Sequence, residues 1–125
     1  MAIRVLSLDI GLTTGYAVVY ARQDDWPIIA MGVISEKDFA QDLRLILSER
    51  RPDKVIAERP VIIRGDLGDR LADLIAKTKE VVPQVEWFDA ASWKQSPVKK
   101  HPMPRGIQTH TKDAIRFAIW YLGRL

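Results

Sequence analysis

The sequence predicts an α/β domain in which helices cover both faces of a mixed five-stranded sheet. Short apolar segments bounded by turn residues are typical of strands, and they occur at residues 3–10, 16–21, 28–34, 54–58 and 85–88. Apolar residues recur at helical spacing within residues 35–50, 67–80 and 110–122. The order strand, strand, strand, helix, strand, helix, strand, helix indicates a three-layer architecture.

The first three strands are expected to form an antiparallel meander. Residues 3–10 lead through a turn rich in Gly and Thr into residues 16–21, and Trp26 and Pro27 precede residues 28–34. Asp9 is the one charged residue between positions 6 and 19. Burying an ionised carboxylate is costly without a metal, a basic partner or several hydrogen bonds. The sequence therefore raises the question of what compensates Asp9.

The first helix is expected to begin after Ser35, because a serine at this place caps a helix and Asp38, three residues later, resembles a capping box. One face of this helix carries Phe39, Leu43, Ile46 and Leu47. Residues 50–52, which include a proline, are expected to end it.

The fourth strand, residues 54–58, ends on a second carboxylate, Glu58. A strand that follows a helical crossover runs parallel to the sheet it joins, so Glu58 is expected near the same sheet end as Asp9 if this strand neighbours the first one. After the second helix and the fifth strand, residues 90–108 are expected to form a long polar loop before the terminal helix. Loops of this length usually bind something, and a disordered linker is the alternative.

Length and composition are those of one globular domain spanning residues 1–125. Apolar residues make up 47% and charged residues 28%, the balance of an ordinary globular protein. The absence of cysteine excludes disulfides, a zinc ribbon and thiol catalysis. No apolar run approaches the roughly 20 residues of a membrane span, and the N-terminal residues are patterned as a strand rather than a secretory signal. We expect a cytoplasmic protein with no membrane partner.

The basic residues are concentrated near the C-terminal end. Residues 1–90 hold 12 Lys and Arg against 15 Asp and Glu, a net charge of −3, whereas residues 91–125 hold seven basic residues against one acidic residue, a net charge of +6. This asymmetry favours an anionic partner such as nucleic acid, with a solvated basic face as the alternative. The candidate nucleic-acid-binding residues are Lys94, Lys99, Lys100, Arg105 and Lys112.

Four residues could form a metal site: Asp9, Glu58, His110 and Asp113. The last two are three residues apart and share one helical turn. Carboxylates with one imidazole suit Mg²⁺ or Mn²⁺, and two such ions about 4 Å apart can hydrolyse a phosphodiester. Each residue also has an ordinary explanation: Asp9 in a turn, Glu58 in an ion pair with Arg59, and the other two in a first helical turn.

Three blocks of the sequence resemble the RuvC-type Holliday-junction resolvases of the RNase H-like superfamily. LSLDIGLTTGYAVV is similar to the family's first hairpin with its leading catalytic Asp, KVIAERP to the strand that ends in the catalytic Glu, and HTKDAIRFAIWYL to the terminal helix that carries the last two ligands. Lys94 lies where the family carries a functional lysine. The region before the terminal helix is shorter here than in the family.

The resemblance implies an RNase H-like three-layer fold and a Mg²⁺-dependent endonuclease that acts on branched DNA, above all four-way junctions. It implies two Mg²⁺ ions, replaceable by Mn²⁺, with Asp9 bridging them, Glu58 and Asp113 completing their shells, and His110 binding one ion or managing protons. It also implies a homodimer, since the family cuts two symmetric strands.

Three other functions fit parts of the sequence. A non-catalytic nucleic-acid-binding module would keep the fold and the basic loop without cleavage, and a YqgF-like enzyme would cut RNA or single strands. The Asp-x-Gly and Thr-Thr-Gly motifs at residues 9–15 also resemble the phosphate-binding hairpin of sugar kinases and actin-like ATPases. Those enzymes need two such domains, which 125 residues cannot supply.

Overall fold

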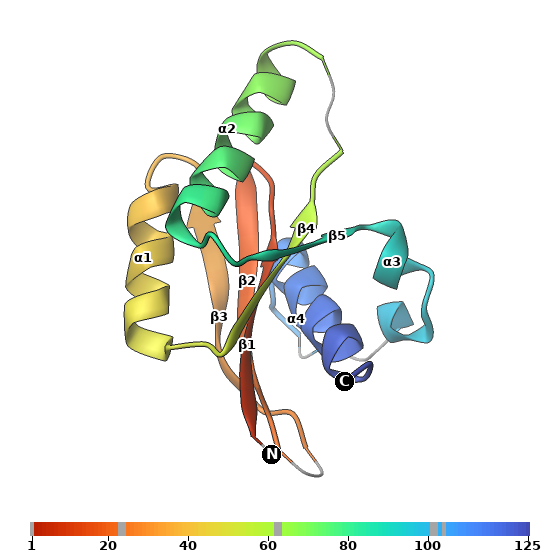
Figure 1. Cartoon of the computed structure of the whole chain (residues 1–125). Coiled ribbons are helices and arrows are strands. Elements are labelled where there is room, and N and C mark those ends of the chain that lie inside the picture. The colour runs from red at the N-terminus through yellow and green to blue at the C-terminus, as the bar shows by residue number, and fades with distance from the viewer. Residues whose placement is uncertain (1, 23–24, 62–63, 101–102, 104) are drawn as a thin grey trace.

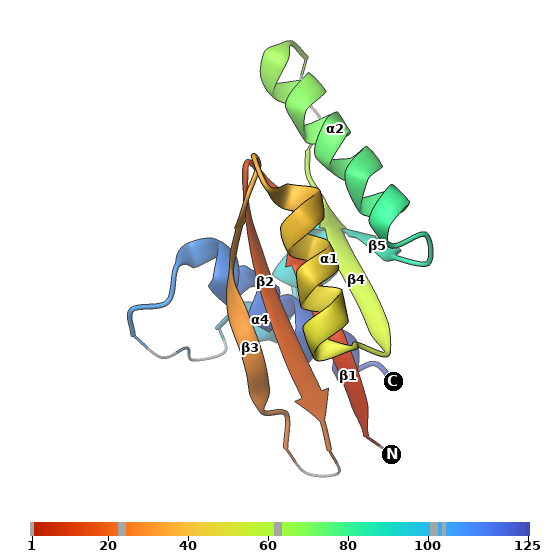
Figure 2. The same ribbon diagram turned by 90° about the vertical axis from the view of Figure 1, so that its left-hand side faces the viewer.

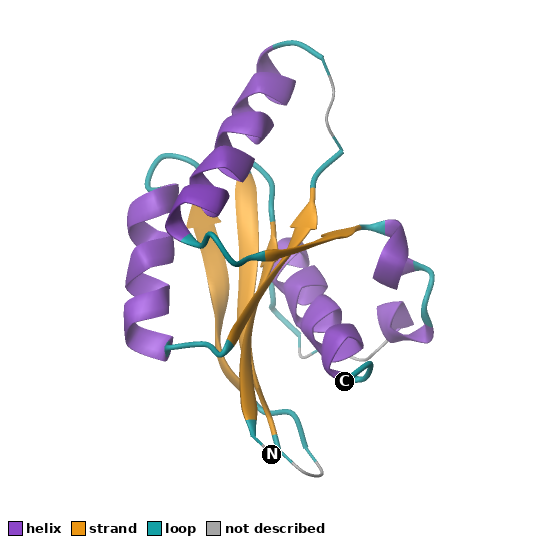
Figure 3. Ribbon diagram, in the orientation of Figure 1, coloured by secondary structure: helices purple, strands orange, loops and turns teal. Residues whose placement is uncertain are grey.

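The computed structural model describes residues 2–22, 25–61, 64–100, 103 and 105–125, except for the side chains of residues 91, 99 and 100. Its elements are shown in Figures 1 and 3. In chain order they are β1 (Ile3–Asp9), β2 (Thr13–Ala21), β3 (Ile28–Ser35), α1 (Phe39–Arg50), β4 (Lys54–Arg59), α2 (Asp66–Val81), β5 (Glu86–Asp89), α3 (Ala91–Lys94), the 3₁₀ turn η1 (Pro97–Lys100) and α4 (Thr109–Leu122).

The five strands form one mixed sheet in the order β3-β2-β1-β4-β5. The first three strands pair antiparallel as a meander, whereas β1 with β4 and β4 with β5 pair parallel. This register places Asp9 of β1 beside Gly15 on one side and beside Glu58 of β4 on the other. The predicted fold class, a mixed five-stranded sheet flanked by helices, is confirmed.

Helices α1 and α2 lie on one face of the sheet and α4 lies on the other (Figures 1 and 2). Strand β1 is buried by both layers: Leu6 and Leu8 pack in the core beneath α1 and α2, whereas Val5 packs in the core beneath α4. Burial on both faces explains why this strand is an almost continuous apolar run rather than an alternating one. Asp9, the last residue of β1, lies on the same face as Val5, at the end of the core beneath α4.

The predicted start of the first helix is wrong. Strand β3 continues through Ser35, and α1 begins at Phe39 after a turn. The Ser35 hydroxyl oxygen does accept a hydrogen bond from the Asp38 backbone N–H at 3.4 Å, but it closes this turn rather than capping a helix. Asp38 is the N-cap residue and its side chain makes no capping bond. The predicted apolar face is confirmed, with Phe39 and Leu43 buried.

The prediction of a structureless loop over residues 90–108 is also wrong. The segment contains α3 and η1, which lie beside α4 in Figure 1. Trp93 causes this order, because its side chain is only 1% exposed and joins the apolar core beneath α4. Part of the predicted loop, residues 101, 102 and 104, lies outside the described residues.

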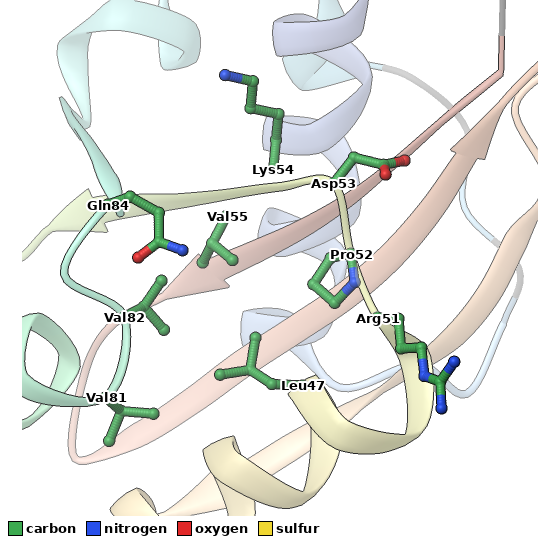
Figure 4. A pocket seen from close by; sticks show the side chains of 9 residues that line it. All are labelled: Leu47, Arg51, Pro52, Asp53, Lys54, Val55, Val81, Val82 and Gln84. Atoms are coloured by element: carbon green, nitrogen blue, oxygen red, sulfur yellow. The ribbon is translucent and has the colours of Figure 1, made fainter.

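A cavity of about 320 Å³ lies where β4 begins, at the opposite end of the sheet from Asp9 and Glu58. Figure 4 shows that its lining combines apolar side chains with a few polar ones. The lining residues are Leu47, Arg51, Pro52, Asp53, Lys54, Val55, Val81, Val82 and Gln84. Among the described helices, none is long and apolar enough to cross a membrane.

Candidate active site

Two buried carboxylates lie side by side where β1 and β4 end. Asp9 and Glu58 are register partners on parallel strands, so their side chains leave the sheet on the same face, the one covered by α4. Asp9 is 9% exposed and Glu58 is 4% exposed. Because like charges in such a setting disfavour ionisation, this sheet end concentrates negative charge that needs a compensating group.

The Asp9 carboxyl is strongly perturbed by its surroundings. Burial, and after it the charge of Glu58, raise its pKa from 3.8 to about 7, although a hydrogen bond from His110 lowers it. The charge of Asp113 raises it further. The His110 Nδ1 atom lies 3.1 Å from Asp9 Oδ2. The Asp9 carboxyl therefore changes its charge near neutral pH and lies within hydrogen-bonding distance of this imidazole.

Glu58 is held by two consecutive residues of α3. The Lys94 Nζ atom lies 3.1 Å from Glu58 Oε1, and the Trp93 Nε1–H donates to Glu58 Oε2 at 3.3 Å. Partial desolvation lowers the pKa of Lys94, but the hydrogen bond and the charge of Glu58 outweigh it, so the pKa is raised overall. Lys94 therefore stays protonated and compensates Glu58 from within the chain.

The start of α4 brings His110 to Asp9. The Gln108 side-chain oxygen caps the helix, accepting from the backbone N–H of His110 at 2.7 Å and of Thr111 at 3.2 Å. A Cβ atom at Gly15 would lie 2.1 Å from the His110 carbonyl oxygen. Since Gly15 is the β2 partner of Asp9, only glycine at this position lets α4 approach closely enough for His110 to contact Asp9.

Two further hydrogen bonds fix α4 to the sheet. The buried Ser7 hydroxyl donates to the Ala114 carbonyl oxygen at 2.7 Å, and the Thr111 hydroxyl donates to the Gly32 carbonyl oxygen at 2.9 Å. One bond joins α4 to β1 and the other joins it to β3, so each ties the helix to a strand of the sheet. Together they fix the height of His110 relative to the end of β1.

The sequence has no match among protein-family models and no match among curated proteins. Among solved structures, it is similar to T. thermophilus RuvC in complex with Holliday junction substrate, at TM-score 0.76 and 17% identity, over 99% of this chain and 96% of that chain. It is also similar to the Fowlpox virus resolvase in complex with Holliday junction DNA, at TM-score 0.66 and 15% identity, over 97% and 99%.

The chain has the fold of the RuvC-type resolvases. Because the identities are only 17% and 15%, these similarities establish the fold and not the activity. A third similar structure, an Aquifex aeolicus PPX-GPPA enzyme, has TM-score 0.50 and 15% identity, and the match covers 74% of this chain but only 38% of that one. The resolvases, in contrast, match over almost their whole length.

Within this RuvC-type fold, the structure brings three of the four predicted metal ligands together. Asp9, Glu58 and His110 lie at the ends of β1, β4 and the start of α4, and Asp113 follows one turn later, half-buried, where its charge acts on Asp9. Among the described residues, no group of three His, Asp or Glu side chains is arranged to hold one metal ion. The two oxygens of Glu58 face Lys94 and Trp93.

The predicted nucleic-acid-binding residues are spread over three elements. Lys94 lies in the site itself, Lys112 is half-buried on α4, and Arg105 is exposed in the turn before α4. Lys99 and Lys100 belong to η1, and their side chains lie outside the described part of the structure.

Sequence reasoning missed Trp93, Gly15 and Ser7 as parts of the site. Trp93 directly precedes Lys94 in the sequence, and a large aromatic residue in a polar segment is a signal of local burial. Nothing in the local sequence distinguishes Gly15 from an ordinary turn glycine, because its close contact is with a residue 95 positions away.

Proposed function

We propose that this protein is a metal-dependent endonuclease that cuts branched DNA, with four-way junctions as its main substrate. One observation carries the proposal: Asp9 and Glu58 are paired in register at the ends of two parallel strands, and α4 presents His110 to the same point. The fold supports this substrate, since the similar RuvC and Fowlpox virus structures were solved with Holliday junction DNA.

The donor atoms at this sheet end suit a hard divalent cation. The raised pKa of Asp9, caused by burial and by Glu58, indicates negative charge that the surrounding side chains compensate incompletely. We assign Asp9, Glu58, His110 and Asp113 as the residues that would hold Mg²⁺ or Mn²⁺, in one or two ions. When bound, such ions activate water and stabilise the charge of a phosphodiester under attack.

Lys94 has two roles in this proposal. In the described structure it neutralises Glu58 at 3.1 Å, and its side chain is about half exposed. A backbone phosphate that approaches the site would attract it away from Glu58 and leave that carboxylate free to act as a ligand. As substrate binds, the metal ion would thus replace the Lys94 ammonium group as the positive charge beside Glu58.

The remaining basic residues, Lys99, Lys100, Arg105 and Lys112, would bind DNA backbone phosphates on either side of the site. Such contacts release counterions, so affinity should fall steeply with salt concentration. Two symmetric cuts require two sites, and we therefore propose a homodimer, which light scattering of the purified protein tests. Cytoplasmic location likewise stays a prediction.

Cleavage of a substrate panel tests the function directly. Labelled four-way junction, fork, linear duplex, single-stranded DNA and single-stranded RNA are each incubated with the protein and Mg²⁺ or Mn²⁺. The proposal predicts paired cuts in the junction and slower cleavage of the fork. Binding without any cleavage would instead favour a non-catalytic module, and cleavage restricted to single strands or RNA would favour a YqgF-like nuclease.

A further inference from the structure

We infer that Trp93 is a positioning residue that fixes the direction of the Glu58 carboxylate. This inference rests on the proposed function, because it concerns how one of the proposed ligands is held. It starts from the two oxygens of Glu58, one of which faces the Lys94 ammonium and the other the Trp93 indole N–H. Both partners come from the single turn of α3, so this turn determines the orientation of the carboxylate.

The indole ring is itself rigidly held. Trp93 is 1% exposed and stacks on Phe117 of α4, with ring centroids 6.2 Å apart and an interplanar angle of 21°. Phe117 in turn packs against Phe88 of β5, edge to face at 5.6 Å. The Nε1–H cannot turn away from Glu58 without breaking this aromatic packing. Its position is therefore fixed by the sheet and by α4, the two elements that carry the other proposed ligands.

The two partners of Glu58 differ in mobility, and this difference gives Trp93 its role. The Lys94 side chain is 46% exposed and carries its ammonium group on a flexible four-carbon chain. A phosphate or a cation can therefore separate it from Glu58. The buried indole stays in place. When Lys94 leaves Oε1, Trp93 still holds Oε2, so the carboxylate keeps its orientation with one oxygen free. Outer partners of this kind fix the orientation of ligating carboxylates and influence affinity for the ion.

The test compares two identical substitutions in the same aromatic cluster. Trp93→Phe keeps most of the ring packing but removes the N–H donor, whereas Trp120→Phe changes a half-buried tryptophan that also packs on Phe117 and makes no hydrogen bond to Glu58 in the described structure. Mn²⁺ binding is measured by calorimetry without DNA. We expect Trp93→Phe to weaken binding about tenfold or more and Trp120→Phe to bind as wild type does. Equal affinity in all three proteins would overturn the inference.

A second measurement needs neither metal nor activity. The indole N–H resonance of Trp93, assigned by its loss in Trp93→Phe, should lie downfield because its acceptor is a buried carboxylate. It should move upfield in Glu58→Gln and stay in place in Glu86→Gln on the neighbouring strand. An indole N–H chemical shift that is unchanged in Glu58→Gln would contradict the inference even if the protein cuts junctions. Conversely, a protein that binds no Mn²⁺ and cuts no junction refutes the proposed function, whereas the resonance still decides whether Trp93 holds Glu58.

Discussion

Asp9→Asn should stabilise the metal-free protein at neutral and alkaline pH. Burial, followed by the charge of Glu58, raises the pKa of Asp9 from 3.8 to about 7. Because a raised carboxyl pKa favours the protonated form of the folded state, its stabilising effect is complete below pH 3.8 and is lost as pH rises through about 7. The wild-type protein therefore pays an electrostatic penalty at pH 8 that asparagine, which cannot ionise, avoids.

The size of this effect follows from the pKa difference. A shift of about 3 units, at about 1.36 kcal/mol per unit, corresponds to about 4 kcal/mol. The pKa of about 7 already includes the lowering effect of the hydrogen bond with His110. We therefore expect an increase of about 4 kcal/mol in the free energy of unfolding near pH 8, and almost none near pH 4.

Urea unfolding in EDTA, repeated across this pH range, measures the effect. Asp89→Asn is the matched control, because Asp89 is exposed at the end of the neighbouring strand β5 and its substitution should leave the pH dependence unchanged. If Asp9→Asn is less stable than wild type at pH 8, or if its stability changes with pH in parallel with wild type, the electrostatic description of the site is incorrect.

Three other substitutions test the architecture of the site. Gly15→Ala should lower the free energy of unfolding by about 3 kcal/mol, because the new Cβ would lie 2.1 Å from the His110 carbonyl oxygen. The control Gly123→Ala, where the nearest atom is 3.5 Å away, should be nearly neutral. Equal urea midpoints for the two variants would contradict the prediction. Ser7→Ala should cost about 1 kcal/mol by removing the buried hydrogen bond between the hydroxyl and the Ala114 carbonyl oxygen, and a thermal melt that matches wild type would refute the predicted role of this bond. Lys94→Gln should reduce the slope of log affinity against log salt for junction DNA by about 1, and an unchanged slope in a fluorescence-anisotropy titration would place Lys94 away from the phosphates.

The arrangement of the sheet was predictable because buried strands have a recognisable pattern of apolar residues in the sequence. Leu6 and Leu8 face one core and Val5 faces the other, so apolar residues are needed on both faces of β1. The proximity of Asp9 and Glu58 followed from the rule that a helical crossover joins parallel strands. Both predictions depend on local pattern plus topology, which the sequence contains.

The helix start and the segment after β5 were not predictable in the same way. A serine followed by an aspartate three residues later favours a helix cap, but the Ser35 hydroxyl satisfies the same backbone donor while closing a turn at the end of β3. The order of α3 depends on Trp93 finding space beneath α4. That space exists only after distant elements have packed, so local composition predicted a loop.

The groups that balance the negative charges of Asp9 and Glu58 were predicted only in part. The sequence suggested Arg59 as the ordinary partner of Glu58, but the Arg59 guanidinium lies over the Trp87 ring at 5.8 Å, while Lys94 pairs with Glu58. Successive residues of a strand face opposite sides of the sheet, so Arg59 could not reach its neighbour's carboxylate. No group of three His, Asp or Glu side chains is arranged around one point among the described residues, and the Glu58 oxygens face Lys94 and Trp93.

Cleavage of a four-way junction by wild type and by Asp9→Asn, with Mg²⁺ and with EDTA, tests the central claim most directly. The claim is that the paired carboxylates at the ends of β1 and β4 form a metal-dependent nuclease site. It predicts that wild type cuts the junction with Mg²⁺ and not with EDTA, and that Asp9→Asn binds the junction without cutting it. Cleavage by Asp9→Asn at the wild-type rate, or an inactive wild type in both Mg²⁺ and Mn²⁺, would contradict it.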